Sequence, residues 1–374
     1  MLFDDRERTD ASAKRYRETE FEFLDRSADP DVAEVRAAIG REFATYIESE
    51  KAELQTRLRS GHRSEFHSAC FELLLFGILT RKGYALEAHP DPETGTTKRP
   101  DFLVTGPEGD IFYLEAVAPK DMNDLEAGTE ARMEEVLDAL DTSPHPDFYL
   151  DIHQRGEPRS QPPARKLIAH VHAWLDSLDS DAVKASVSAG GEHPGINWGH
   201  DGWELEFRAL PKHKNRGVLD RLVGFVSYGL DSVDLKGRIR EAIRKKGNRY
   251  GDLPHPLIVA VNANAFYLKD YDEVDALFGS EAVAFGNGAA ELVRENDGAW
   301  HDGKKPRTTR VSAAWIFSHL GFYSLHGCRQ TLYFNPWAAV PLKAPLDWLP
   351  TARLEGRDLV RRDGQSPGEI YGIR

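Results

Sequence analysis

The order of predicted elements between residues 64 and 152 constrains the fold of this chain more than any other feature. Apolar side chains recur at helical spacing from Phe66 to Ile78, which predicts a helix over residues 64–82 that ends before Gly83. Short apolar segments separated by turn-forming residues follow it. We expect strands at 84–88, 101–105 and 111–118, a helix at 125–140 and a strand at 148–152. This order predicts an α/β sandwich in which helices cover a mixed sheet.

The chain is longer than one ordinary compact core requires. Its 374 residues suffice for two cores, or for one core with large additions. Residues 1–60 are highly charged with apolar positions at helical spacing, and we expect a helical N-terminal extension there. Residues 61–180 hold the predicted core. Residues 181–374 are expected to form an α/β extension packed on that core, with a buried strand at 257–261.

Composition is typical of a soluble globular protein. Hydrophobic residues make up 40% of the chain and charged residues 29%. No apolar run reaches the roughly 20 residues that span a bilayer, and the N-terminus lacks a secretory pattern, so we expect a cytoplasmic protein with no membrane partner. The formal charge of −13 argues against a protein that coats nucleic acid indiscriminately. A local basic stripe can still guide a phosphate backbone.

Three acidic residues stand where a metal site would need them. Asp101 begins one predicted strand, Glu115 lies within the next, and Glu72 lies on the helix before both. Mg²⁺ prefers hard oxygen ligands, and a charged residue in a buried strand is costly unless it is paired or metal-bound. The alternative interpretation is that these are surface acids on edge strands.

The residues around these acids resemble the PD-(D/E)XK nuclease superfamily. The resemblance lies in FELLLFGILTRKGY, which contains Glu72, in RPDF, which contains Asp101, and in YLEAV, which contains Glu115. It covers roughly residues 64–152. It implies a restriction-endonuclease-like core in which Glu72, Asp101 and Glu115 hold Mg²⁺ or Mn²⁺ and catalyse phosphodiester hydrolysis.

The chain departs from the motif of this superfamily at one position. The motif lysine should stand two residues after the glutamate, where strand alternation places both on one face, but this position is Val117. Members of the superfamily are known for moving this lysine. The candidates here are Lys98, Lys120 and Lys246, and each could equally be an ordinary solvated lysine.

A basic segment before the predicted strand at 257–261 is the second informative feature. Arg240, Arg244 and Lys245 can cluster on one region of a helix, with Arg249 and Tyr250 beyond its end. Such a segment could bind a phosphate backbone and offer an aromatic platform. Alternatively, it is an amphipathic helix whose basic side faces water.

The sequence therefore predicts a metal-dependent nuclease, with DNA as the expected substrate and a homodimer as one expected assembly. By analogy alone, such a nuclease acts in restriction or mobile-element defence. The first alternative is a catalytically inactive protein on the same fold that serves as a nucleic-acid-binding or protein-interaction scaffold. The second is an unrelated enzyme that uses its carboxylates otherwise.

Overall fold

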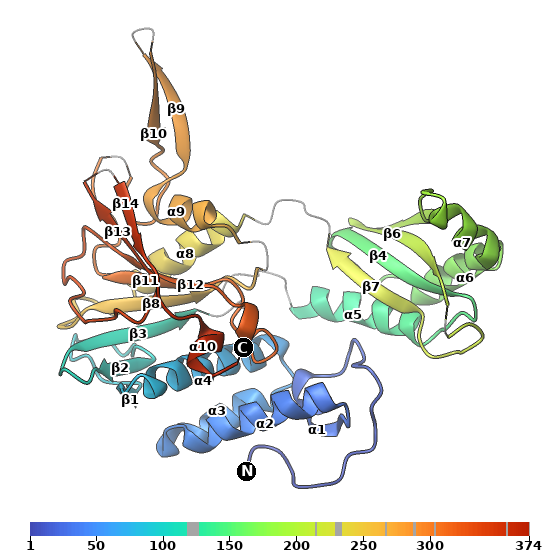
Figure 1. The fold of residues 1–374 in the computed structure, drawn as a ribbon, viewed down its shortest axis with the longest axis horizontal. Coiled ribbons are helices and arrows are strands. Elements are labelled where there is room, and N and C mark those ends of the chain that lie inside the picture. The colour runs from blue at the N-terminus through green and yellow to red at the C-terminus, as the bar shows by residue number, and fades with distance from the viewer. Residues whose placement is uncertain are drawn as a thin grey trace. The chain divides into compact units, whose positions relative to one another are not determined.

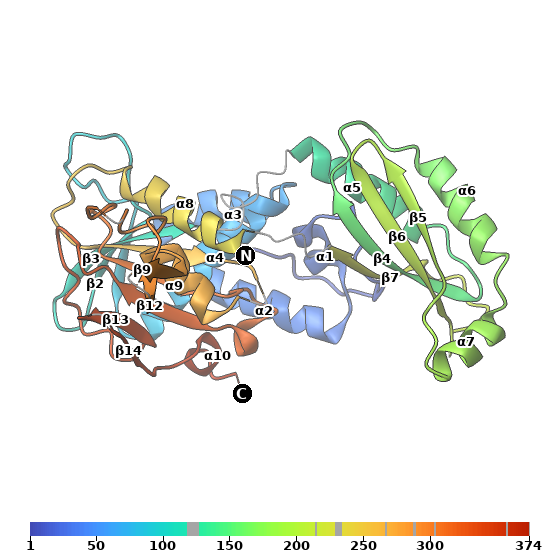
Figure 2. The same ribbon diagram turned by 90° about the horizontal axis from the view of Figure 1, so that it is seen from above.

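The chain folds into two compact units. The computed structural model describes all residues except 118–126, 214, 229–233, 266–267, 287–288, 303, 357 and 374. Unit 1 comprises residues 1–12, 19–124 and 234–374, and unit 2 comprises residues 13–18 and 125–233. Unit 2 is drawn mostly in green in Figures 1 and 2, whereas unit 1 takes in the blue and the yellow-to-red parts of the chain.

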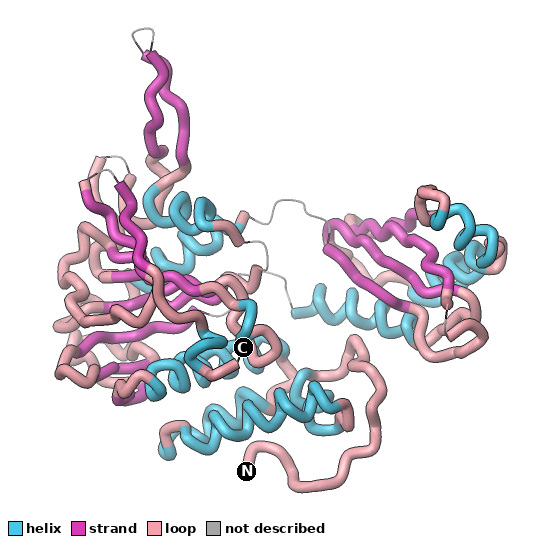
Figure 3. Tube along the Cα trace, in the orientation of Figure 1, coloured by secondary structure: helices cyan, strands magenta, loops and turns pink. Residues whose placement is uncertain are grey.

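An eight-stranded mixed sheet forms the centre of unit 1 (Figure 3). In spatial order its strands are β1 (Ala85–Ala88), β2 (Phe102–Thr105), β3 (Ile111–Val117), β8 (Leu257–Asn262), β11 (Ala313–Phe317), β12 (Gln330–Phe334), β13 (Thr351–Glu355) and β14 (Asp358–Arg362). Strands β1, β2 and β3 pair antiparallel, as predicted for the strands that carry Asp101 and Glu115, and β3, β8 and β11 pair parallel. This confirms a mixed α/β architecture with one large sheet.

Helices cover both faces of this sheet. The helices of unit 1 are α1 (Glu20–Arg26), α2 (Pro30–Thr45), α3 (Lys51–Leu58), α4 (Arg63–Arg81), α8 (Leu235–Gly247), α9 (Asp270–Phe278) and α10 (Pro367–Ile370), with 3-10 turns η1 (Glu48–Glu50) and η3 (Leu325–Gly327). One apolar core joins α1 to α4 with one face of the sheet, and another joins α8 and α9 with the other face. The N-terminal helices therefore belong to the same core as α4.

The predicted order of helix, three strands, helix and strand occurs in unit 1, but with a different second half. Helix α8 and strand β8 follow β3 in the sheet, after the chain has passed through unit 2. The prediction that a helix at 125–140 and a strand at 148–152 complete this sheet is wrong. The expected core at 61–180 is divided between the two units, and residues 234–374 extend the large sheet.

Unit 2 has its own four-stranded sheet and its own core. Its strands, in spatial order, are β5 (Gly195–His200), β6 (Trp203–Pro211), β4 (Phe148–Gly156) and β7 (Val223–Tyr228), and its helices are α5 (Ala127–Asp141), α6 (Ala164–Leu175) and α7 (Ser180–Ser188). Apolar side chains of α5 and α6 pack on one face of this sheet.

Burial patterns explain why β8 and not β4 completes the large sheet. Strand β4 alternates, with Leu150 and Ile152 buried and the polar residues between them partly exposed, so it can have only one covered face. Every residue of β8 is buried, as a central strand between two helical layers requires.

A separate hairpin of β9 (Glu281–Gly286) and β10 (Ala289–Arg294) follows α9.

No helix in the described part of the chain combines the length and apolar character needed to cross a bilayer.

Candidate functional site

Adjacent strands bring Asp101 and Glu115 together at one end of their pairing. Leu103 on β2 pairs with Tyr113 on β3, so Asp101 lies opposite Glu115 two residues further along. Strand alternation puts both acids on the face of Leu103 and Tyr113, which is covered by α8. The backbone N–H of Asp101 donates to Glu115 Oε2 at 3.3 Å, and that of Ala116 donates to Asp101 Oδ2 at 2.7 Å.

Lys246 supplies the positive charge that strand β3 lacks. Val117, at the motif position of the lysine, is fully buried in the core between β3 and α8. From α8, Lys246 Nζ donates to Glu115 Oε1 at 2.8 Å. Glu115 is 1% exposed and Lys246 7% exposed, so this ion pair is almost completely removed from water. Replacing either residue of this pair should destabilise the fold, because an uncompensated buried charge is strongly destabilising.

Two residues just beyond α8 also approach Glu115. Arg249 Nη1 lies 3.6 Å from Glu115 Oε1, and the Arg249 side chain is 40% exposed. The Tyr250 hydroxyl is buried and has no hydrogen bond of ordinary geometry among the described residues. Burial and the nearby Glu115 carboxylate raise the pKa of Tyr250 well above its usual value. Tyr250 therefore places a buried hydroxyl close to the Glu115 carboxylate.

Glu72 is engaged by residues of the N-terminal helices. Tyr46 Oη donates to Glu72 Oε1 at 2.5 Å, and Arg57 Nη2 donates to Glu72 Oε2 at 2.6 Å. Burial and the Glu72 carboxylate raise the pKa of Tyr46. Glu72 is 5% exposed, and these two donors engage both of its oxygens inside the protein. This arrangement makes Glu72 a fixed, buried charge paired with Arg57.

Asp101 is the electrostatically strained member of the group. It is partly exposed at the end of its strand, yet burial of its carboxyl is the main cause that raises its pKa well above 3.8. The negative charges of Glu115 and Glu72 act in the same direction, whereas the Ala116 N–H and Lys246 oppose them. The charged form of Asp101 is therefore disfavoured first by burial and then by its two acidic neighbours.

Asp101 and Glu115 are the two carboxylates of the site that lie side by side on neighbouring backbone segments. In the described ranges, no group of three or more His, Cys, Asp or Glu side chains is arranged to hold a metal ion, so the expected trio with Glu72 is not formed. Mg²⁺ is commonly held by one or two carboxylates, with water and phosphate in the remaining positions. A cation beside Asp101 would stabilise the charged form that burial and the neighbouring carboxylates disfavour. The donor set thus suits Mg²⁺ or Mn²⁺.

The other predicted lysines differ in outcome. Lys98 is exposed in the loop before β2, and no hydrogen bond or ion pair joins its side chain to the two acids in the described part of the chain. Lys120 falls in the segment 118–126, outside the described residues. Of the three candidates, Lys246 is the one found against Glu115.

Sequence reasoning missed Tyr46 and Arg57, which hold Glu72. Tyr46 follows helix α2 and Arg57 lies on α3, so both come from the segment that was expected to be a separate extension. A Tyr and an Arg carry no motif by themselves. The only available signal was the buried Glu72, whose charge requires partners somewhere in the fold.

Comparisons with known proteins identify no relative. No family model matches the sequence. No curated protein and no solved structure matches the chain either.

Proposed function

We propose that this protein is a metal-dependent nuclease of the PD-(D/E)XK type that hydrolyses phosphodiester bonds, with DNA as its expected substrate. The observation that carries the proposal is the buried contact of Lys246 with Glu115, next to Asp101 on the adjacent strand. A lysine from α8 occupies the neighbourhood that the missing lysine of β3 would otherwise fill. The order α4, β1, β2, β3, α8, β8 in unit 1 also supports this proposal.

Each residue has a distinct part in the proposed reaction. Asp101 and Glu115 would hold the ion, which when bound polarises the phosphate and lowers the pKa of an attacking water. Lys246 pairs with Glu115 and orients it, and its ammonium places positive charge where negative charge develops on the phosphate. Arg57 and Tyr46 fix Glu72 as a buried charge, which adds to the negative field at Asp101.

A cleavage assay with paired substitutions tests this proposal. Glu115→Gln keeps the shape of the side chain but removes the charge that an ion needs, and Lys246→Met removes the ammonium. Both variants should lower Mg²⁺-dependent cleavage of DNA by a factor on the order of 100 or more. Glu108→Gln and Lys98→Met are the matched controls, because both residues are exposed, and should cleave like the wild type.

The same assay separates the nuclease from a scaffold on this fold. A scaffold would cut no nucleic acid in any variant, with Mg²⁺ or Mn²⁺. If the wild type cuts and Lys246→Met cuts equally well, Lys246 does not replace the motif lysine. If Glu115→Gln retains full activity, the carboxylate pair is not the catalytic centre.

A further inference from the structure

Two neighbouring segments of unit 1 concentrate positive charge on a chain that is acidic as a whole. Residues 236–249 contain seven Lys or Arg and one Glu, and residues 304–310 contain four Lys or Arg and no acid. The formal charge of the whole chain is −13. The two segments therefore form a local exception, and they come from α8 and from the loop before β11.

Close packing holds the two segments side by side. A Cβ atom on Gly247 would lie 2.5 Å from Thr308 Cγ2 and 2.8 Å from Val311 Cγ2, so only glycine permits this approach. The Thr308 hydroxyl donates to the carbonyl of Ala299 at 2.8 Å, which anchors the loop. The basic residues of the loop are thus fixed beside the end of α8.

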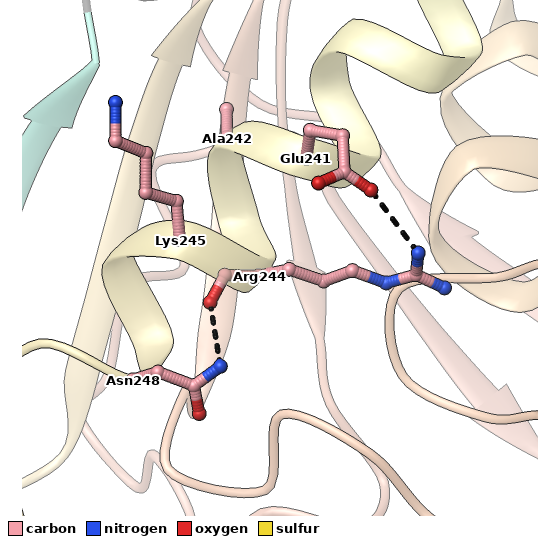
Figure 4. Close-up of a pocket in the computed structure, with 5 residues that line it drawn as sticks. All are labelled: Glu241, Ala242, Arg244, Lys245 and Asn248. Atoms are coloured by element: carbon pink, nitrogen blue, oxygen red, sulfur yellow. Dashed lines mark hydrogen bonds and ion pairs between the residues drawn. The ribbon is translucent and has the colours of Figure 1, made fainter.

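Two adjoining surface depressions lie along this contact and share Arg244 and Asn248. The first is lined by Glu241, Ala242, Arg244, Lys245 and Asn248 (Figure 4), and the second by Arg244, Asn248, Lys305, Pro306, Arg307 and Thr308. Figure 4 shows Glu241 and Arg244 joined on one side of α8 and Lys245 extending away from them. We call the two depressions together the α8 groove.

The cations that line the groove differ in how far their charge is used within the protein. The Arg244 guanidinium donates to the carbonyls of Asp297 and Gly298, at 3.2 and 2.8 Å, so it holds the turn beside α8. Lys245 and Lys305 are exposed. The Arg307 side chain is 49% exposed, although it pairs with Asp302. The charge offered to a ligand therefore comes mainly from Lys245, Lys305 and Arg307.

The helix that lines the groove also carries a residue of the candidate active site. Lys245 directly precedes Lys246, whose ammonium contacts Glu115, and the half-exposed Arg249 follows at the end of the helix and approaches the same carboxylate. Helix α8 therefore offers Lys245 to the groove and Lys246 to Glu115.

We propose that the α8 groove binds the sugar-phosphate backbone of a nucleic acid. This inference rests on the proposed nuclease function and names the surface that holds its substrate. Exposed cations spaced along a groove suit a chain of phosphates, and Asn248 adds a neutral hydrogen-bonding group. A membrane surface fits less well, because membrane-binding segments pair cations with exposed apolar residues. None of the large exposed apolar side chains in the described residues lies within 241–249 or 304–310.

Binding of a fluorescein-labelled DNA duplex in EDTA tests the groove without cleavage. The charge-reversal variant Lys245→Glu/Lys305→Glu is compared with Lys184→Glu/Lys343→Glu, which changes the net charge equally at two exposed lysines elsewhere. The groove variant should bind at least about tenfold more weakly, and its log–log salt slope should fall by about two. The control variant should stay within about twofold of the wild type. Thermal melts of both variants establish that they fold.

Two results would overturn the proposal. One is a groove variant that binds DNA as tightly as the wild type or no more weakly than the control variant. The other is a wild type that binds no nucleic acid but binds vesicles containing phosphatidylserine. Failure of the nuclease proposal looks different: DNA binding that depends on the groove but is followed by no Mg²⁺-dependent cleavage supports the groove and rejects the enzyme.

Discussion

At the scale of single residues, Asp101 combines the features that a protein tolerates only for a purpose. Its carboxyl is crowded by Glu115 and influenced by Glu72, while the Ala116 N–H and Lys246 compensate in part. Glu115 itself is matched by Lys246 at 2.8 Å. A bound cation would stabilise the charged form of Asp101, which burial and these carboxylates disfavour.

The raised pKa of Asp101 predicts a specific pH dependence of stability in the absence of metal. The folded state keeps the proton above pH 3.8, where the unfolded state releases it. The stability contributed by this proton is complete below about pH 4 and is lost as pH rises through the raised pKa, by at most about 1.4 kcal/mol per pH unit.

Asp101→Asn removes this loss, since the amide has no proton to release. Urea unfolding in EDTA between about pH 4 and pH 8 should show the variant gaining stability relative to the wild type as pH rises. If the free energy of unfolding changed equally with pH in the two proteins, the raised pKa of Asp101 would be contradicted.

At the scale of elements, local sequence predicts the first half of the core and fails at the second. Helix α4 and strands β1, β2 and β3 follow from periodicity and turn residues, and with them the juxtaposition of Asp101 and Glu115. The segment after β3 also reads as a helix and a strand, so nothing local reveals that it forms a separate unit. The uninterrupted apolar run at 257–261 was the better indicator of a central strand, and every residue of β8 is indeed buried.

The residues that contact the candidate acids could not be predicted from local sequence either. Lys246 is 131 positions from Glu115, so the sequence could offer it only as one of several lysines. Tyr46 and Arg57 reach Glu72 because α2 and α3 pack on α4, a tertiary contact that no spacing encodes. The carboxylates were predictable because strand pairing is local, whereas their cationic and phenolic neighbours depend on long-range packing.

At the scale of the whole molecule, the chain interrupts one unit to build another. It leaves unit 1 after β3, which carries Glu115, and re-enters it at α8, which carries Lys246. Unit 2 has a core of its own, built from α5, α6 and its sheet. A unit with a separate core is expected to fold independently of the chain that surrounds it.

The isolated segment 125–233 should therefore fold alone. It contains 109 residues (233 − 125 + 1), and a two-state domain of this size unfolds with an enthalpy of about 70 kcal/mol near 60 °C. Differential scanning calorimetry of the fragment should show one cooperative transition of this order. A fragment with no heat-absorption peak would mean that unit 2 needs the rest of the chain.

The most direct measurement of the proposed metal-dependent site is anomalous diffraction from crystals soaked in Mn²⁺. We predict one strong manganese peak with carboxylate oxygens of both Asp101 and Glu115 at about 2.1 Å, and loss of that peak in crystals of Asp101→Asn. A peak bound to other residues, or no peak near this pair in well-diffracting soaked crystals, would contradict the assignment of the two carboxylates as the metal ligands of a nuclease.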